Sequence, residues 1–481
     1  MDSTRTTTRD IRRQNRSILL SKLFFDGPLS RLELSQLTGL SSATVSTVTA
    51  ELIDDRLIVE AGQVESGGGR PRVLLRVDPA YGYVVGVDVG ETGVTVELFD
   101  ISLQRLVSVV RPVASHRPDP EAVVAEIVGG ISDVLAQHAE MVAGSADGAD
   151  GPGSADGADE ADGAGSADGA HEADRSGLDR RRPVGAADIV GVGVGVPGIV
   201  AEGVRADHVL SVAAPTSASR ATAGRTSLVH APTIGWDGVA LADMLAEAGV
   251  AAPIFVGNGA KTQAQAEMWF GAARGARHAI VALVGSGVGA AIISDGVPYQ
   301  GTTSSAGEWG HTTLVYGGRE CRCGAHGCLE AYVGAEGILD RYAASGRPDH
   351  RDPSAGNGSP GGAADEMAGI AALVASATGE RSDPAAADLL AETAAFLGTG
   401  IGNLINLFNP ERVVLGGWAG LALGSVALSQ IRAAAETQSL AHPYDQVRIE
   451  LSELGLDAVA LGAATLPLAE LLQRGDGPRR P

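Results

Sequence analysis

The first 80 residues carry apolar positions at helical spacing. Three stretches place apolar side chains every three or four residues, and each predicts a helix. Ser30 and Glu33 have the spacing of a capping box, Gly39 breaks the second stretch, and Ser41 is a candidate N-cap for the third. Two strand-like runs then flank a glycine-rich segment, which predicts a hairpin. This order of elements predicts a winged helix-turn-helix over residues 1–80. The predicted helices lie at 15–25, 30–40 and 41–57, and the hairpin strands at 57–62 and 72–77.

From Tyr81 the pattern changes to buried strands and longer helices. Three successive strands, a helix and further strands occur in two halves of the chain, which predicts an α/β fold of two lobes around a cleft. Residues 143–186 and 346–369 are rich in small and acidic residues, and we expect both to be disordered insertions within 81–481. The predicted strands lie at 83–90, 94–100, 106–113, 188–200, 253–258, 278–296, 412–417 and 447–454, and the predicted helices at 119–142 and 457–472.

Charge is distributed unevenly along the chain. The 481 residues are too many for one core and carry a formal net charge of −22. Residues 1–80 hold 11 Lys and Arg against 10 Asp and Glu, so the negative charge belongs to the remainder. The N-terminal region is therefore the part that can approach DNA. The start of the chain lacks the apolar segment of a signal peptide, and no apolar stretch suggests a membrane span, so we expect a cytoplasmic protein without a membrane partner.

All three cysteines fall in the segment GEWGHTTLVYGGRECRCGAHGCLE, residues 307–330. His311 with Cys321, Cys323 and Cys328 makes one imidazole and three thiolates, a complete tetrahedral set for a structural Zn²⁺. Chance clustering of buried thiols is the alternative, and His326 is a rival ligand.

The cysteine segment, with GVDVGET, GVGVPG, GSGVGAAI, VVLGG and the N-terminal motifs, resembles the ROK family of repressors, open reading frames and sugar kinases. The resemblance covers nearly the whole chain outside the two insertions. It implies an actin-like (ribonuclease H-like), two-lobed, sugar-binding fold after the winged helix, and a homodimer or homotetramer. A winged helix marks the regulator branch of the family. The positions matching the family's sugar ligands are Asn258, Glu308, His311 and Glu330.

The loop after the strand at 253–258 departs from the family's kinases. In those enzymes the residue after the Asn is the aspartate that serves as general base, whereas this chain has Gly259, which cannot take a proton. Lys261 does not replace it, because an unperturbed lysine is protonated. Glu91 puts a negative charge where the resemblance locates the nucleotide phosphates. The second glycine loop, 285–289, is intact, although it could simply be a tight hairpin.

The third predicted helix would enter the major groove of DNA by its N-terminal part. Val45 and Val48 must face the core, so small polar residues face outward toward bases and phosphates. Arg70 in the wing is a candidate for the minor groove or phosphate, and basic residues of the first helix for phosphates. A protein-interaction module is the alternative. The outward-facing set is Ser42, Ala43, Thr44, Ser46 and Thr47, and the basic set is Arg9, Arg12, Arg13 and Arg16.

These features predict a sugar-responsive transcriptional regulator that binds a double-stranded operator, acts as a repressor and is not an enzyme. Two alternatives stay open at this point. One is an ATP-dependent sugar kinase with an added DNA-binding head, and the other is a DNA-binding protein whose sugar pocket is vestigial.

Overall fold

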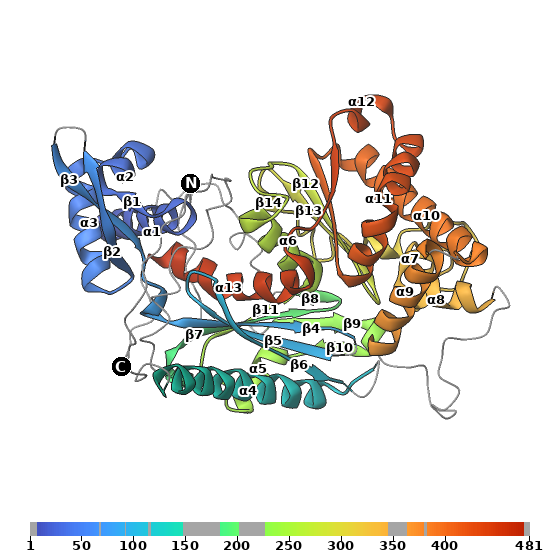
Figure 1. The fold of residues 1–481 in the computed structure, drawn as a ribbon, viewed down its shortest axis with the longest axis horizontal. Coiled ribbons are helices and arrows are strands. Elements are labelled where there is room, and N and C mark those ends of the chain that lie inside the picture. Colours follow the sequence, from blue (N-terminus) through green and yellow to red (C-terminus); the bar gives the residue numbers. More distant parts are fainter. Residues whose placement is uncertain are drawn as a thin grey trace, which may run out of the picture.

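The computed structural model describes residues 7–66, 69–91, 93–113, 117–147, 183–201, 227–344, 363–379 and 382–475. The N-terminal region, here called the head, is three helices and a three-stranded sheet of order β1-β3-β2 (Figure 1). Ser30 and Glu33 form the predicted capping box, and Ser41 accepts the Thr44 N–H at 3.1 Å as the third helix begins. The winged-helix prediction is confirmed. The elements are α1 (Thr8–Asp26), β1 (Leu29–Ser30), α2 (Arg31–Thr38), α3 (Ser42–Asp54), β2 (Ile58–Ser66) and β3 (Gly69–Val77).

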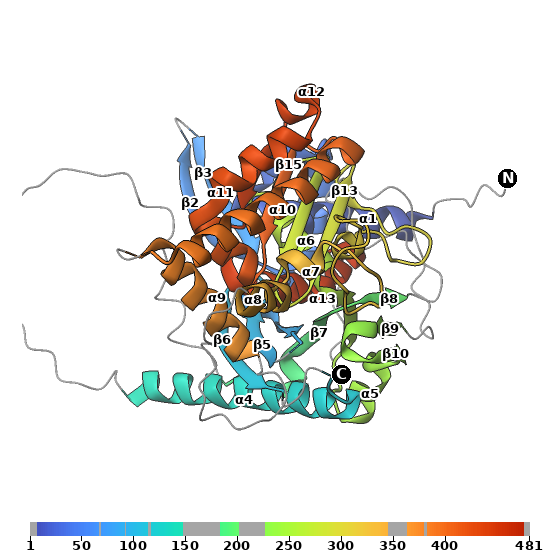
Figure 2. The ribbon, with the colours of Figure 1, turned by 90° about the vertical axis from the view of Figure 1, so that its right-hand side faces the viewer.

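A first lobe follows, built on a five-stranded sheet of order β11-β7-β4-β5-β6. Strands β4, β5 and β6 run antiparallel, while β7 and β11 add parallel to β4. Helix α4 covers the outer face of this sheet, away from the second lobe (Figures 1 and 2). The elements are β4 (Tyr83–Val89), β5 (Gly93–Asp100), β6 (Arg105–Pro112), α4 (Pro120–Asp147), β7 (Ile189–Val196), β8 (Ile199–Ala201), β9 (Leu228–Ala231), β10 (Trp236–Val239), α5 (Leu241–Glu247) and β11 (Ile254–Asn258).

The second lobe repeats this plan with a sheet of order β14-β13-β12-β15-β16. When the five strands of each main sheet are numbered in chain order, both sheets have the strand order 3-2-1-4-5. The predicted two-lobed α/β fold is therefore confirmed. Helices α10 and α11 pack together on this sheet (Figure 1). The elements are α6 (Gly259–Phe270), β12 (Ala279–Val284), β13 (Val288–Ser294), β14 (Val297–Pro298), α7 (Glu330–Val333), α8 (Ala335–Ala344), α9 (Ala363–Thr378), α10 (Pro384–Phe408), β15 (Arg412–Gly416), α11 (Trp418–Gln438), α12 (Ala441–Tyr444) and β16 (Arg448–Leu451). The last helix, α13 (Ala458–Arg474), returns to the sheet of the first lobe.

The alternating Gly and Val residues of β7 face opposite sides of the sheet. Val192 and Val194 point into the core of the first lobe and are fully buried. The glycines point to the other face, where α13 lies. A Cβ at Gly193 would stand 1.8 Å from the Ala463 carbonyl oxygen, and one at Gly86 would stand 2.1 Å from that of Ala460. The missing side chains therefore let the backbone of α13 rest directly on the sheet.

The head shares a continuous hydrophobic core with the two lobes. That core joins residues of α1, α2 and α3 to α6, α13 and the sheet of the second lobe. The Phe25 ring of α1 packs edge-on against Trp269 near the end of α6, with centroids 4.9 Å apart. Arg16, expected to reach DNA phosphates, is instead buried: its guanidinium donates to the Gly475 carbonyl at 2.7 Å and pairs with Asp55. The head is thus packed against the body through α1.

Three expectations about segments need correction. The first predicted insertion is shorter, because α4 continues to Asp147 and a short helical turn begins at Ala186. The second is also shorter, because α9 already begins at Ala363; the rest of both insertions lies outside the described residues. Among the described residues, one helix, Gly455–Arg474, is long and apolar enough to cross a membrane, contrary to the expectation. It is mostly buried against α6, β4 and β7, which is typical of a core helix.

Candidate functional site

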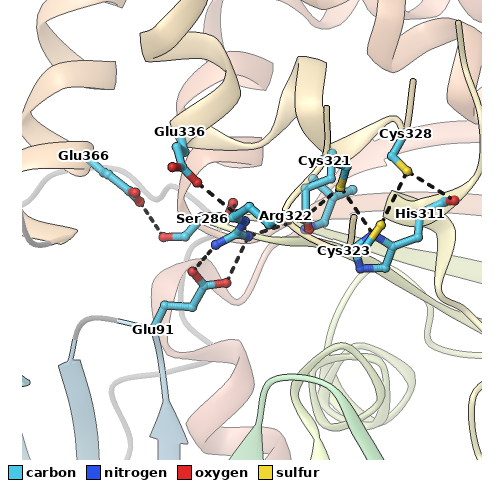
Figure 3. A network of polar contacts seen from close by, with 11 residues as sticks. Glu91, Ser286, His311, Cys321, Arg322, Cys323, Cys328, Glu336 and Glu366 are labelled. Atoms are coloured by element: carbon cyan, nitrogen blue, oxygen red, sulfur yellow. Dashed lines mark hydrogen bonds and ion pairs between the residues drawn. The ribbon is translucent and has the colours of Figure 1, made fainter. Parts of the chain in front are cut away.

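The predicted metal ligands form one cluster. His311 lies in a short helical turn after β14, and the three cysteines lie in the loop that leads into α7. One ligand atom from each of the four residues lies within 4.8 Å of all the others. The His311 Nδ1 and Cys321 Sγ atoms are 3.7 Å apart, and the Cys323 and Cys328 Sγ atoms are 3.8 Å apart (Figure 3). Tetrahedral zinc bonds of about 2.3 Å to sulfur and about 2.0 Å to nitrogen require ligand separations of about 3.5 to 3.8 Å. The four residues therefore fit such an ion.

Two thiols of this cluster, Cys321 and Cys328, are buried and resist ionisation. Burial raises the pKa of Cys321 to about 12, and it also raises the pKa of Cys328. A bound divalent cation reverses this effect, because it deprotonates a coordinating thiol outright. His326, the rival ligand, is exposed and is not part of the cluster; its backbone pairs with Glu320 and closes the loop.

The four predicted sugar ligands lie around the start of α6 and the metal cluster. Asn258 is the N-cap of α6: its side-chain oxygen accepts the Lys261 N–H at 3.1 Å, and its amide donates to Gly198 of the first lobe at 2.6 Å. Glu308 is half-buried, and burial raises its pKa, while the nearby charges of His311 and Lys261 lower it. Asn258, Glu308 and His311 are therefore grouped where α6 meets the metal loop.

Lys261 belongs to this group, although the sequence indicates only a protonated lysine that cannot replace the missing base. Its side chain is 9% exposed, and its ammonium donates to the Gln300 side chain at 2.6 Å and to the Ser304 carbonyl at 2.5 Å. It thereby holds the loop before Glu308 against α6. The signal available in the sequence was its spacing, because position i+3 from the N-cap faces the same side of the helix start.

Glu330 lies beside the metal cluster, with one carboxylate oxygen 3.8 Å from the Cys321 Sγ atom, and it also contacts Val288 and Arg322. One carboxylate oxygen accepts the Val288 N–H at 2.9 Å, and the other lies 3.4 Å from the Arg322 guanidinium. Arg322 also forms a two-pronged ion pair with Glu91, at 2.5 and 3.1 Å (Figure 3). Glu91 is in the first lobe and Arg322 is in the metal loop of the second, so this pair joins the lobes. The position of the Glu91 charge was predicted from the sequence, but its partner Arg322, 231 residues away, was not.

Packing does not force a glycine at position 259. A Cβ there would meet its nearest neighbour, the Val196 carbonyl oxygen, at 3.6 Å, which is ordinary contact. Gly259 is the first residue of α6, where a carboxylate would also be favoured by the helix dipole. The lack of an acidic side chain at position 259 is therefore not imposed by steric limits.

The predicted DNA-reading residues lie on one side of α3. Ser42, Ala43, Ser46 and Thr47 are exposed, and Thr44 is half-buried with its hydroxyl 2.9 Å from that of Ser41. Val45 and Val48 are buried in the core, as expected. Arg70 lies in β3, and its side chain is outside the described residues.

Comparison with known proteins agrees with these features. The sequence profile of the ROK family matches residues 180–470. The chain belongs to the ROK family. It is similar to the xylose repressor of Caldicellulosiruptor bescii, with 27% identity over 470 residues, which cover 95% of this chain and 96% of the relative. A glucokinase of Halalkalibacterium halodurans is 31% identical over 281 residues, covering 58% of this chain and 76% of the enzyme. A crystal structure of a ROK family transcriptional regulator, at 23% identity, superposes with a TM-score of 0.64 over 97% of both chains.

Proposed function

We propose that this ROK protein is a sugar-responsive, DNA-binding transcriptional regulator, a repressor rather than a kinase, that acts in the cytoplasm. The observation that carries the proposal is the course of α6. Its first turn carries Asn258 and Lys261 of the candidate pocket, and its last turn carries Trp269, which packs on the head. A helix of 12 residues spans about 18 Å, so one rigid element connects the two regions.

The pocket chemistry suits a monosaccharide. Sugar hydroxyls both donate and accept hydrogen bonds, and the amide of Asn258 with the carboxylate of Glu308 can serve both needs. His311 would hold a structural Zn²⁺ through one ring nitrogen and offer the other to the sugar. The metal would fix the loop that carries Glu308. Glu330 is kept in the proposed sugar set as an anchor of that loop, given its bond to Val288. The xylose repressors among the relatives favour a pentose such as D-xylose.

Kinase activity is not supported by the residues at the start of α6. Gly259 offers no general base, and Glu91 faces the guanidinium of Arg322 between the lobes. The relatives matched over nearly their full length along this chain include xylose repressors, whereas the glucokinase match covers 58% of this chain.

For DNA binding, we propose that residues 1–80 are the DNA-binding domain and residues 81–481 the ROK body. The exposed side of α3 would enter the major groove, with Arg70 of the wing on the neighbouring backbone or minor groove. A homodimer or homotetramer would present two heads to the half-sites of an operator. Sugar binding would shift the balance of lobe arrangements and, through α6, the position of the heads.

A thermal-shift screen of the full chain tests the sugar pocket. D-Xylose, D-glucose and N-acetyl-D-glucosamine are each added at a series of concentrations. We expect one of them to raise the unfolding temperature, because a ligand that binds only the folded state stabilises it. Asn258→Ala should abolish the shift, and Asn406→Ala, an Asn that bonds Gln438 and Leu440 at the far end of the second lobe, should not. Release of ADP at about one per second or faster would instead support the kinase alternative.

A further inference from the structure

Two glycine hairpins face each other across the lobes. One is the β4–β5 turn, where Gly90 donates to the Gly93 carbonyl, and the other is the β12–β13 turn, where Gly285 donates to the Gly287 carbonyl, both at 2.9 Å. They join the same pair of strands in the two matching sheets. Turns of this type expose backbone N–H groups and commonly bind anions. A phosphate between the lobes would have to lie between these two hairpins.

The carboxylate of Glu91 lies in that space. A Cβ added at Gly287 of the second hairpin would stand 3.3 Å from a Glu91 oxygen and 3.6 Å from Arg322. Glu91 is 8% exposed, and both of its oxygens face the Arg322 guanidinium. A carboxylate and a phosphate offer the same planar pair of acceptor oxygens to an arginine. Glu91 therefore offers the Arg322 guanidinium of the second lobe two acceptor oxygens, as a bound phosphate would.

The second hairpin is also occupied by side chains of the protein. Its Val288 N–H donates to Glu330, and the Ser286 carbonyl accepts from Arg322 at 3.3 Å. The Ser286 hydroxyl donates to Glu366 of α9 at 2.5 Å (Figure 3). The Val288 N–H and the Ser286 hydroxyl, two donors that could hold a phosphate, are thus already bonded within the chain.

We propose that Glu91 is an internal substitute for a nucleotide phosphate, which holds the two lobes together through Arg322 and excludes nucleoside phosphates from the cleft. Arg322 faces Glu91, Glu330 at 3.4 Å and Glu336 at 3.5 Å, so three carboxylates surround one guanidinium. The excess negative charge repels an incoming phosphate. The contact between the two lobes of this protein then forms without a bound nucleotide. The proposal rests on the two hairpins and goes beyond the proposed sugar response.

Nucleotide binding tests the substitution directly. ADP is titrated by calorimetry into the full chain, which should show no saturable binding. Glu91→Gly removes the carboxylate and leaves Arg322 facing the hairpins, and it should bind ADP with a dissociation constant of about 1 mM or tighter. Adding Arg322→Gln to that variant should abolish the binding. Zinc content and thermal unfolding establish that each variant is folded. A folded, zinc-loaded Glu91→Gly protein that does not bind ADP, or a parent protein that does, overturns the proposal.

Amide hydrogen exchange tests the contact between the lobes without any ligand. Glu91→Gln keeps the size of the side chain and removes its charge. Exchange in the β4–β5 and β12–β13 hairpins should become faster by about tenfold, which corresponds to about 1.4 kcal/mol. Glu126→Gln is the matched control, because it breaks an ion pair with Arg111 that lies wholly within the first lobe. Equal exchange in these hairpins for the parent and Glu91→Gln contradicts the proposal. Neither experiment uses sugar or DNA, so their failure is distinguishable from failure of the proposed function.

Discussion

The contact between α6 and the head predicts that one aromatic side chain controls the sugar response. Trp269→Leu keeps an apolar side chain at this position but removes the ring that packs edge-on against Phe24 and Phe25, at 5.6 and 4.9 Å between centroids. Each aromatic pair contributes about 0.5–1.5 kcal/mol beyond the burial of its area. Two pairs across the boundary are therefore worth about 1–3 kcal/mol. Coupling between two ligand sites typically amounts to the same 1–3 kcal/mol, or about 5–150-fold in affinity.

Loss of these two contacts should therefore remove most of the effect of sugar on DNA affinity. The assay is fluorescence anisotropy of a DNA fragment from upstream of the protein's own gene, with and without saturating sugar. We expect the ratio of the two dissociation constants to fall to about 2 or less in Trp269→Leu.

Trp236→Leu is the matched control. Trp236 is 3% exposed and Trp269 is 5% exposed, but Trp236 lies in the core of the first lobe, away from the head. It should lose a comparable amount of stability and keep its sugar response. The reasoning is refuted if folded Trp269→Leu retains the full ratio, or if both variants lose it equally.

Three further predictions concern the metal loop, the start of α6 and the first sheet. Cys323→Ser should lower zinc content by elemental analysis and weaken sugar affinity, because the loop carrying Glu308 loses its anchor; unchanged values would disprove the ligand assignment. Gly259→Asp should fold normally yet release no ADP with sugar and ATP, since Glu91 still blocks the phosphates; rapid turnover would contradict this. Burial, with a smaller effect from a neighbouring carboxylate, raises the pKa of Asp88 to about 7. A raised carboxyl pKa costs stability as pH rises from about 4 to 7, so Asp88→Asn should be the more stable protein at pH 8 by up to about 4 kcal/mol, and no more stable at pH 4, in urea unfolding.

Local features of the fold could be predicted from the sequence because their causes are local. The caps at Ser30 and Ser41 depend on residues three positions apart, and the alternation in β7 directly records which face is core. The metal cluster was predictable for the same reason, because its four ligands span only residues 311 to 328.

Long-range pairings could not be predicted in this way. The partner of Glu91 is set by the approach of two lobes, and no local spacing encodes it. Arg16 looked like a phosphate contact because its helix is basic, but its burial depends on the end of α13, 459 residues away along the chain. The start of α9 was hidden because its Ala-rich sequence continues the composition of the insertion before it.

The direct test of the central claim is a titration of sugars into the complex of the full chain with its operator DNA. D-Xylose, other monosaccharides and their phosphates are added while the dissociation constant for DNA is measured. The account predicts that one unphosphorylated sugar changes this constant by about fivefold or more, and that Asn258→Ala abolishes the change. An unchanged DNA affinity with every sugar and sugar phosphate would contradict the account and would favour a vestigial pocket.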